Sequence, residues 1–137
     1  MTFRERLQLE PKASDVATLN EWLDSSFTKA GTQAPIAADL KLCINEAVAN
    51  LISYAFVSPN SGLIVVEVTL DAQTAKGVIF DNGLSFRLTA WPDLKKPQTL
   101  SETKPGGFGL GLIKERAKSI DYETSGSLNK LTIICGA

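Results

Sequence analysis

The chain has 137 residues, with 14 basic and 15 acidic side chains and no histidine. Such a length is typical of one domain that buries its core without disulfides or metals. The balanced charge argues against direct nucleic-acid binding, which needs a basic excess to hold phosphates. The absence of histidine excludes Ser-His-Asp triads, His-ligated metals and a phosphohistidine on this chain.

Neither a secretory leader nor a membrane span is expected. The first fifteen residues lack the apolar core of a signal peptide, and the longest apolar run, residues 63–70, is interrupted by Glu67. Cys43 and Cys135 are the only cysteines and have apolar neighbours, which favours reduced, buried thiols over a disulfide framework. We therefore expect a cytoplasmic protein with no membrane partner.

The first half of the chain predicts one strand followed by two helices. Apolar and polar side chains alternate over residues 3–9, as in a half-buried strand. Ser14 or Asp15 is expected to cap a first helix, which Gly31 ends. Residues 35–56 then predict a second helix, opened by a proline.

The second half predicts four strands and a third helix. Residues 63–70 and 75–80 are β-rich runs that form an antiparallel hairpin. Residues 87–106 lose all periodicity, and a loop of this length is usually functional or disordered. The third helix is expected from about Gly107 to about Ile120, with Leu110, Ile113 and Ala117 inward, and the last strands at 122–128 and 130–135, with a turn near 127–129. The sum is an α+β fold, a two-layer α/β sandwich with helices on one mostly antiparallel, mixed sheet.

Two polar side chains interrupt the second helix, which is otherwise largely apolar. Glu46 and Asn50 stand four residues apart, so they share one helical face with Cβ atoms about 6 Å apart, flanked by Cys43 and Ser53. No Lys or Arg follows Lys41 in this helix, so Glu46 should be poorly solvated and without a cation. The pair either addresses a polar ligand or satisfies backbone groups inside a packed core.

A second polar group, Asp81-Asn82-Gly83, directly follows the strand that ends at Phe80. A carboxylate at a strand end accepts a hydrogen bond from an exocyclic amine, and the glycine lets the backbone approach a flat ring. The alternative is a simple turn that ends the strand.

The third group is a glycine-rich segment at the start of the third helix, with Gly107, Gly109 and Gly111 at alternate positions. Free backbone amides at a helix N-terminus bind phosphate oxygens. Each glycine costs about 1 kcal/mol inside a helix relative to alanine, so three of them indicate a compensating role. The spacing matches neither the Gly-Lys-Ser/Thr phosphate loop nor the dinucleotide fingerprint.

In this order, the three groups resemble the GHKL ATPase superfamily with its Bergerat fold, and within it the anti-sigma-factor serine/threonine protein kinases. The resemblance covers nearly the whole chain and implies one histidine-kinase-like ATPase domain over residues 1–137, with an ATP lid over about 87–106. It implies the cofactors ATP and Mg²⁺. It assigns Glu46 as general base and Asn50 as the Mg²⁺ ligand, Asp81 and Gly83 to adenine, and the phosphates to Gly107, Gly109, Leu110 and Gly111. Lys104 is a candidate contact to the terminal phosphate; a solvated loop lysine is the alternative.

Two positions depart from the family pattern. Family members commonly have His where this chain has Tyr54, and a second glycine where it has Ser85. The resemblance still implies a kinase that phosphorylates a small anti-sigma antagonist and binds a sigma factor, with a homodimer formed through the N-terminal region. The alternatives are an ATP-binding switch that binds proteins without phosphoryl transfer, and an α+β scaffold that binds no nucleotide.

Overall fold

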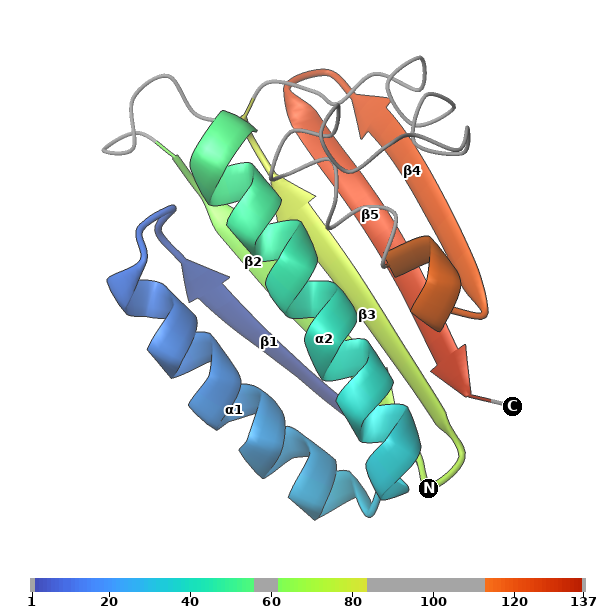
Figure 1. Ribbon diagram of the computed structural model, residues 1–137. Coiled ribbons are helices and arrows are strands. Elements are labelled where there is room, and N and C mark those ends of the chain that lie inside the picture. Colours follow the sequence, from blue (N-terminus) through green and yellow to red (C-terminus); the bar gives the residue numbers. More distant parts are fainter. Residues whose placement is uncertain (1, 56–61, 84–112, 137) are drawn as a thin grey trace, which may run out of the picture.

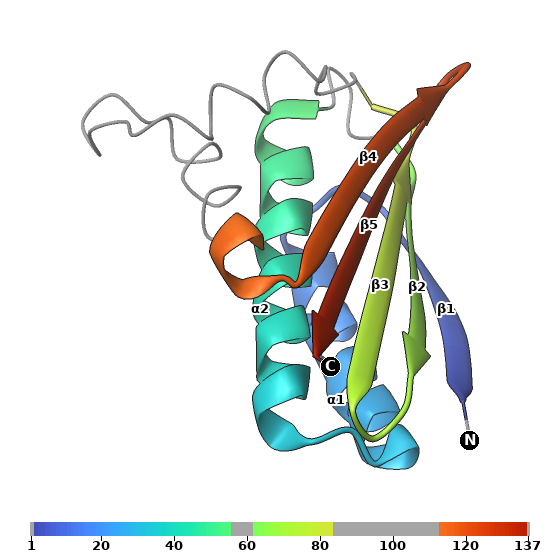
Figure 2. The same ribbon diagram turned by 90° about the vertical axis from the view of Figure 1, so that its right-hand side faces the viewer.

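The computed structural model describes residues 2–55, 62–83 and 113–136. In these ranges a five-stranded sheet with the order β1-β2-β3-β5-β4 carries two helices on one of its faces (Figures 1 and 2). All four strand pairings are antiparallel. The predicted α+β two-layer sandwich is confirmed. The elements are β1 (Phe3–Leu9), α1 (Ser14–Ala30), α2 (Ala34–Asn50) with a π-helical turn after it (Leu51–Ala55), β2 (Ile64–Leu70), β3 (Thr74–Asp81), β4 (Ser119–Ser125) and β5 (Leu128–Gly136).

Three local predictions need correction. Neither Ser14 nor Asp15 caps α1: the residue before the helix is Ala13, and Asp15 Oδ2 instead accepts from the Glu10 backbone N–H at 2.9 Å. The third helix does not reach Ile120, because helical residues end at 116 and the Lys118 N–H already donates to a carbonyl of β5. The last turn lies at residues 126–127, where Gly126 supplies a positive φ of 61°.

The core lies between the sheet and the helices. Alternate side chains of β2 and β5 point to the helical face and are buried, while their neighbours face the other side of the sheet. Both cysteines are buried free thiols, as predicted. The hydrogen bond with the neighbouring Cys135 thiol, and then burial, raise the pKa of Cys43, which keeps its thiol protonated. The largest fully buried side chains are Leu19, Leu23, Leu40, Ile44, Ile64, Leu70, Ile79, Ile113, Ile133, Val48, Val66 and Val68.

Helix α2 packs closely against the central strand β3. A Cβ atom at Gly77 would lie 2.9 Å from Ile44 Cδ1 and 3.2 Å from Leu40 Cδ1. The bare glycine therefore lets the helix approach the strand, and the Ile44 side chain fills the space above it. Among the described helices, none is long and apolar enough to cross a bilayer.

Replacing Ile44 by alanine should cost about 2–5 kcal/mol of unfolding free energy, because glycine on the facing strand cannot fill the cavity. Leu128→Ala is the matched control, since Leu128 is 42% exposed, and should stay within about 0.5 kcal/mol. Urea unfolding gives both values. In the Ile44→Ala background, Gly77→Ala should recover stability because its methyl group enters the vacated space; a further loss would contradict this packing.

Candidate functional site

The polar groups predicted from the sequence gather at one end of the two layers. Glu46 and Asn50 lie in the last turns of α2, and Asp81 is the last residue of β3. Both elements run toward the same end of the molecule (Figures 1 and 2). Helix α2 contacts β3 and β5 directly, so these residues belong to one region.

Asp81 is a buried carboxylate held by neutral donors. Its side chain is 3% exposed. Its Oδ1 atom accepts from the Gly83 backbone N–H and from Asn129 Nδ2, each at 2.9 Å. Burial raises the pKa of Asp81, and the Asn129 and Gly83 hydrogen bonds lower it in part. The bond from the Gly83 N–H is the turn that was considered as the alternative for this segment.

Asn129 is the site residue that the sequence did not predict. It opens the buried face of β5, directly opposite Asp81 in the sheet register, and its Nδ2 also donates to the Gly83 carbonyl at 3.0 Å. A signal was present in the sequence, because Asn129, Leu131, Ile133 and Cys135 alternate along one face of the strand. A polar residue at the end of that buried row has to find a partner.

Glu46 and Asn50 differ in their surroundings. Glu46 is partly buried, and no described Lys or Arg forms an ion pair with it. Asn50 is 3% exposed, and its Nδ2 donates to the Glu46 carbonyl at 2.9 Å. This bond is the backbone satisfaction considered as the alternative. The helical face that carries Glu46 and Asn50 is not polar along its whole length, because Cys43 is buried in the core while Ser53 is exposed.

The side-chain oxygens at this end of the molecule suit Mg²⁺ and a purine. The bond to the Glu46 carbonyl uses the nitrogen of the Asn50 carboxamide, and the oxygen of that group is a hard ligand of the kind that Mg²⁺ takes. Because Mg²⁺ keeps several waters, one protein oxygen suffices. Asp81 supplies an acceptor in a buried setting. No group of three or more His, Cys, Asp or Glu ligands occurs within the described residues.

Part of the predicted site lies outside the described residues. These positions are Ser85, Lys104, Gly107, Gly109, Leu110, Gly111 and the proposed lid over 87–106.

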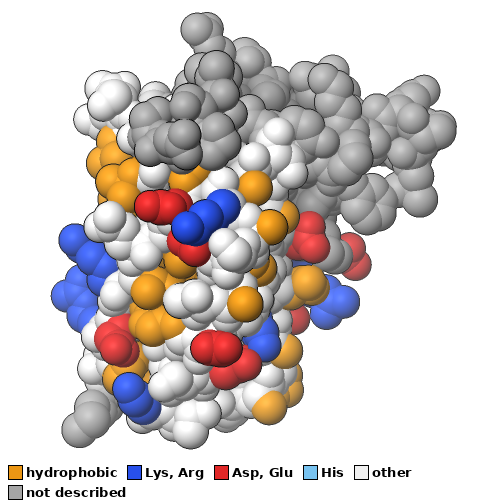
Figure 3. All heavy atoms as spheres, turned by 90° about the vertical axis from the view of Figure 1, so that its left-hand side faces the viewer, with side chains coloured by type: hydrophobic (Ala, Val, Ile, Leu, Met, Phe, Trp, Pro, Cys, Tyr) orange, Lys and Arg blue, Asp and Glu red, His pale blue; other side chains and the backbone are white. Residues whose placement is uncertain are grey.

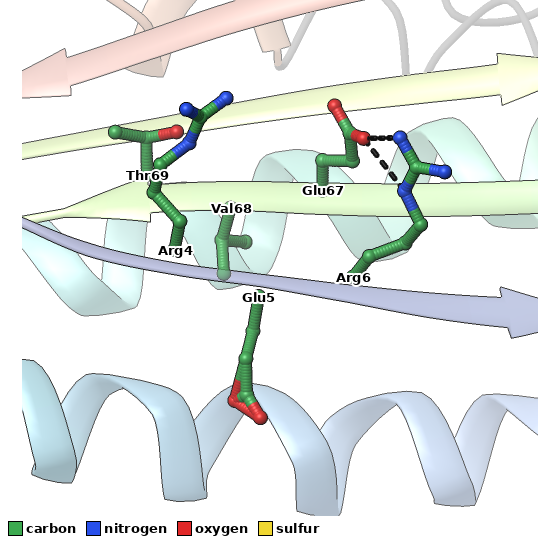
Figure 4. Close-up of a pocket in the computed structure, with 6 residues that line it drawn as sticks. All are labelled: Arg4, Glu5, Arg6, Glu67, Val68 and Thr69. Atoms are coloured by element: carbon green, nitrogen blue, oxygen red, sulfur yellow. Dashed lines mark hydrogen bonds and ion pairs between the residues drawn. The ribbon is translucent and has the colours of Figure 1, made fainter.

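A hollow of about 420 Å³ lies elsewhere, over β1 and β2 (Figure 4). Arg4, Arg6, Glu67 and Thr69 line it from the sheet face away from the helices, and Arg6 forms an ion pair with Glu67. It contains none of the predicted site residues. On the adjoining side of the molecule, acidic and basic side chains are interspersed (Figure 3).

Known proteins are similar to this chain in sequence and fold. The histidine kinase-like ATPase domain matches residues 9–135. The chain is 25% identical to the serine/threonine-protein kinase BtrW of Bordetella bronchiseptica over 94% of this chain and 91% of that one. It is 30% identical to the serine-protein kinase RsbW of Listeria monocytogenes serotype 4a over 79% of this chain and 71% of that one.

Solved structures agree in fold. The RsbU and RsbW domains of a Mycobacterium tuberculosis protein match with a TM-score of 0.69 and 16% identity, over 97% of this chain and 32% of that one. This chain therefore spans about a third of that protein's solved length. The catalytic domain of the histidine kinase ThkA matches with a TM-score of 0.52 and 12% identity, over 96% of this chain and 95% of that one. With the sequence match across nearly its whole length, the chain belongs to the histidine kinase-like ATPase domain family, the GHKL type, together with the RsbW and BtrW protein kinases.

Proposed function

We propose that this chain is a serine/threonine protein kinase of the anti-sigma-factor type. It binds Mg-ATP in a single domain over residues 1–137, phosphorylates a small anti-sigma antagonist and binds a sigma factor in the cytoplasm. The kinase names of its relatives support the reaction class. The assignment of an anti-sigma antagonist and a sigma factor as partners is based on the resemblance of its motifs to those of the anti-sigma-factor kinases.

The observation that carries the proposal is the buried Asp81 carboxylate. A charge removed from water without a cation destabilises the fold. Within the described chain, burial raises the pKa of Asp81, and two uncharged donors, the Asn129 carboxamide and the Gly83 backbone N–H, lower it in part. A purine amine is the missing complement, because it donates a hydrogen bond and adds no charge.

The chemistry at the other end of the nucleotide is assigned to α2. The substrate hydroxyl oxygen attacks the γ-phosphorus, the bond from the γ-phosphorus to the β,γ-bridging oxygen breaks, and ADP leaves. Glu46 accepts the hydroxyl proton, and no described Lys or Arg forms an ion pair with it. Asn50 holds Mg²⁺, which neutralises phosphate charge when bound. Gly107, Gly109, Leu110, Gly111 and Lys104 are proposed to hold the phosphates under the lid.

Glu46→Gln should lower phosphoryl transfer by about 10²- to 10⁴-fold and leave ATP affinity within a few-fold, because the amide keeps the shape and loses the base. The assay follows labelled γ-phosphate onto a purified antagonist domain, beside calorimetric ATP titration. Glu21→Gln, on the exposed side of α1, is the control and should match the wild type in both measurements.

The same two measurements separate the alternatives. Tight ATP binding by the wild type with no transfer to any antagonist domain would select a switch module, in which nucleotide changes partner affinity. Ser85 and the atypical end of the second helix, at Tyr54, motivate this alternative. An unchanged transfer rate in Glu46→Gln would remove Glu46 from the chemistry.

Asp81→Asn should weaken ATP by about 10- to 100-fold, the cost of losing a charge-assisted hydrogen bond, yet should not destabilise the protein. The asparagine oxygen still accepts from Gly83 and Asn129, and no buried charge remains. Because the pKa of Asp81 is raised on folding, the wild type loses stability as pH rises from its unfolded to its folded pKa. The stability gain in Asp81→Asn should therefore grow over that window, which urea unfolding at several pH values measures. A gain that shrinks as pH rises would contradict the burial argument.

We also propose a homodimer through the N-terminal region. Strand β1 stands at the edge of the sheet, and an edge strand offers backbone groups to a second copy. Light scattering should give twice the chain mass of 14.7 kDa. A single-chain mass at micromolar concentration would contradict the dimer.

A further inference from the structure

Asn129 ties together the two ends of the Asp81–Gly83 segment from a different strand. Its Nδ2 atom donates to Asp81 Oδ1 at 2.9 Å and to the Gly83 carbonyl at 3.0 Å. A carboxamide nitrogen has two hydrogens, so this nitrogen is fully used. Asn129 is 3% exposed, and its burial fixes this arrangement.

The three residues form a closed set of hydrogen bonds. Gly83 donates its N–H to Asp81 Oδ1 at 2.9 Å while its carbonyl accepts from Asn129. Oδ1 thus receives two donors, which sets the plane of the carboxyl group and turns Oδ2 to the opposite side. The adjacent Asn82 is held toward β2, since its Oδ1 accepts from the Leu63 N–H at 2.8 Å. The segment therefore has little freedom at the point where a base would lie.

We propose that Asn129 is a positioning residue that sets the preference for a 6-amino over a 6-oxo purine, by holding Asp81 Oδ1 so that Oδ2 faces the base as an acceptor. The inference rests on the proposed ATP binding. An acceptor oxygen attracts the adenine amine and repels the guanine carbonyl, so discrimination depends on which face of the carboxylate is presented. Asn129 itself does not touch the base.

Two variants test this role. Asn129→Ala removes both bonds, and Mg-ATP affinity should fall about 10- to 100-fold, with a smaller fall for Mg-GTP, so that the ratio of the two drops. Asn129→Asp keeps the volume and replaces the donor by an acceptor next to Asp81. Two adjacent carboxylates cannot both ionise readily, so Mg-ATP affinity should be lowest at high pH.

The pH dependence separates positioning from mere structural support. In the wild type, Mg-ATP affinity should fall as pH is lowered through the pKa of Asp81, which burial raises, because a protonated Asp81 is a weaker acceptor. In Asn129→Asp the slope should reverse over the same range, because a proton shared by the pair restores a donor to Asp81. A packing role alone would leave the slope as in the wild type.

Asn20→Ala is the matched control. Asn20 and Asn45 also bridge two elements, α1 and α2, through reciprocal bonds of 2.9 and 2.7 Å. Loss of the Asn20 side chain should lower the stability of the protein and leave the ratio of ATP affinity to GTP affinity unchanged. An independent readout on the wild type is the pair of Asn129 side-chain amide resonances, which should shift when Mg-ATP saturates the protein.

The outcomes are distinct. The positioning role would be overturned if folded Asn129 variants kept the wild-type ratio of ATP to GTP affinity and the wild-type dependence of ATP affinity on pH. It would also be overturned if the Asn129 side-chain amide resonances of the wild type did not shift with Mg-ATP, a measurement that requires no variant. Failure of the wild type to bind Mg-ATP would overturn the proposed function and this inference with it. A lowered ratio with a reversed slope in Asn129→Asp would support both.

Discussion

The close packing of α2 against β3 at Gly77 is the constraint on which the geometry of the candidate site depends. Ile44 occupies the space that a side chain at Gly77 would need, and the fully buried Leu40 and Val48 extend the same contact along the helix. The polar residues lie further along both elements, toward the same end. Core packing, rather than a bond between the polar groups, therefore fixes how far the proposed base and metal ligand stand from Asp81.

At that end, the fold keeps a group that destabilises it. Among the described residues Asp81 accepts from neutral donors alone, so its buried charge lowers stability at neutral pH, and asparagine would satisfy the same donors without that cost. Such a position is expected where binding requires charge or an unshared acceptor. The hydrogen bonds from Asn129 and Gly83 reduce the cost without adding a cation, which leaves the carboxylate available to a ligand.

Much of the fold was predictable because its signals are local. Alternation over residues 3–9, a positive-φ glycine at residue 31 and the short loop between β2 and β3 each encode their element directly. The end of the third helix was missed because pairing with β5 overrides helical propensity at Lys118. The N-cap of α1 was predicted wrongly because the Asp15 side chain bonds back to the preceding loop.

The site was predictable only where its residues form a short motif. Asp81 and Gly83 are two positions apart in one turn, and Glu46 and Asn50 share a helical face, so their spacing in the sequence indicates them. Asn129 lies 48 positions from Asp81, and its role depends on the β3–β5 register, which no local pattern gives. Gly107, Gly109, Leu110 and Gly111 remain a prediction from sequence, since they lie outside the described residues.

A crystal structure with Mg²⁺ and a non-hydrolysable ATP analogue tests the central claim most directly. We expect the adenine amine within hydrogen-bond distance of Asp81 Oδ2, Mg²⁺ on the Asn50 carboxamide oxygen, and Glu46 facing the γ-phosphate. Nucleotide bound at another surface, or a base that turns its ring edge away from Asp81 while Asn129 keeps its bonds, would contradict it.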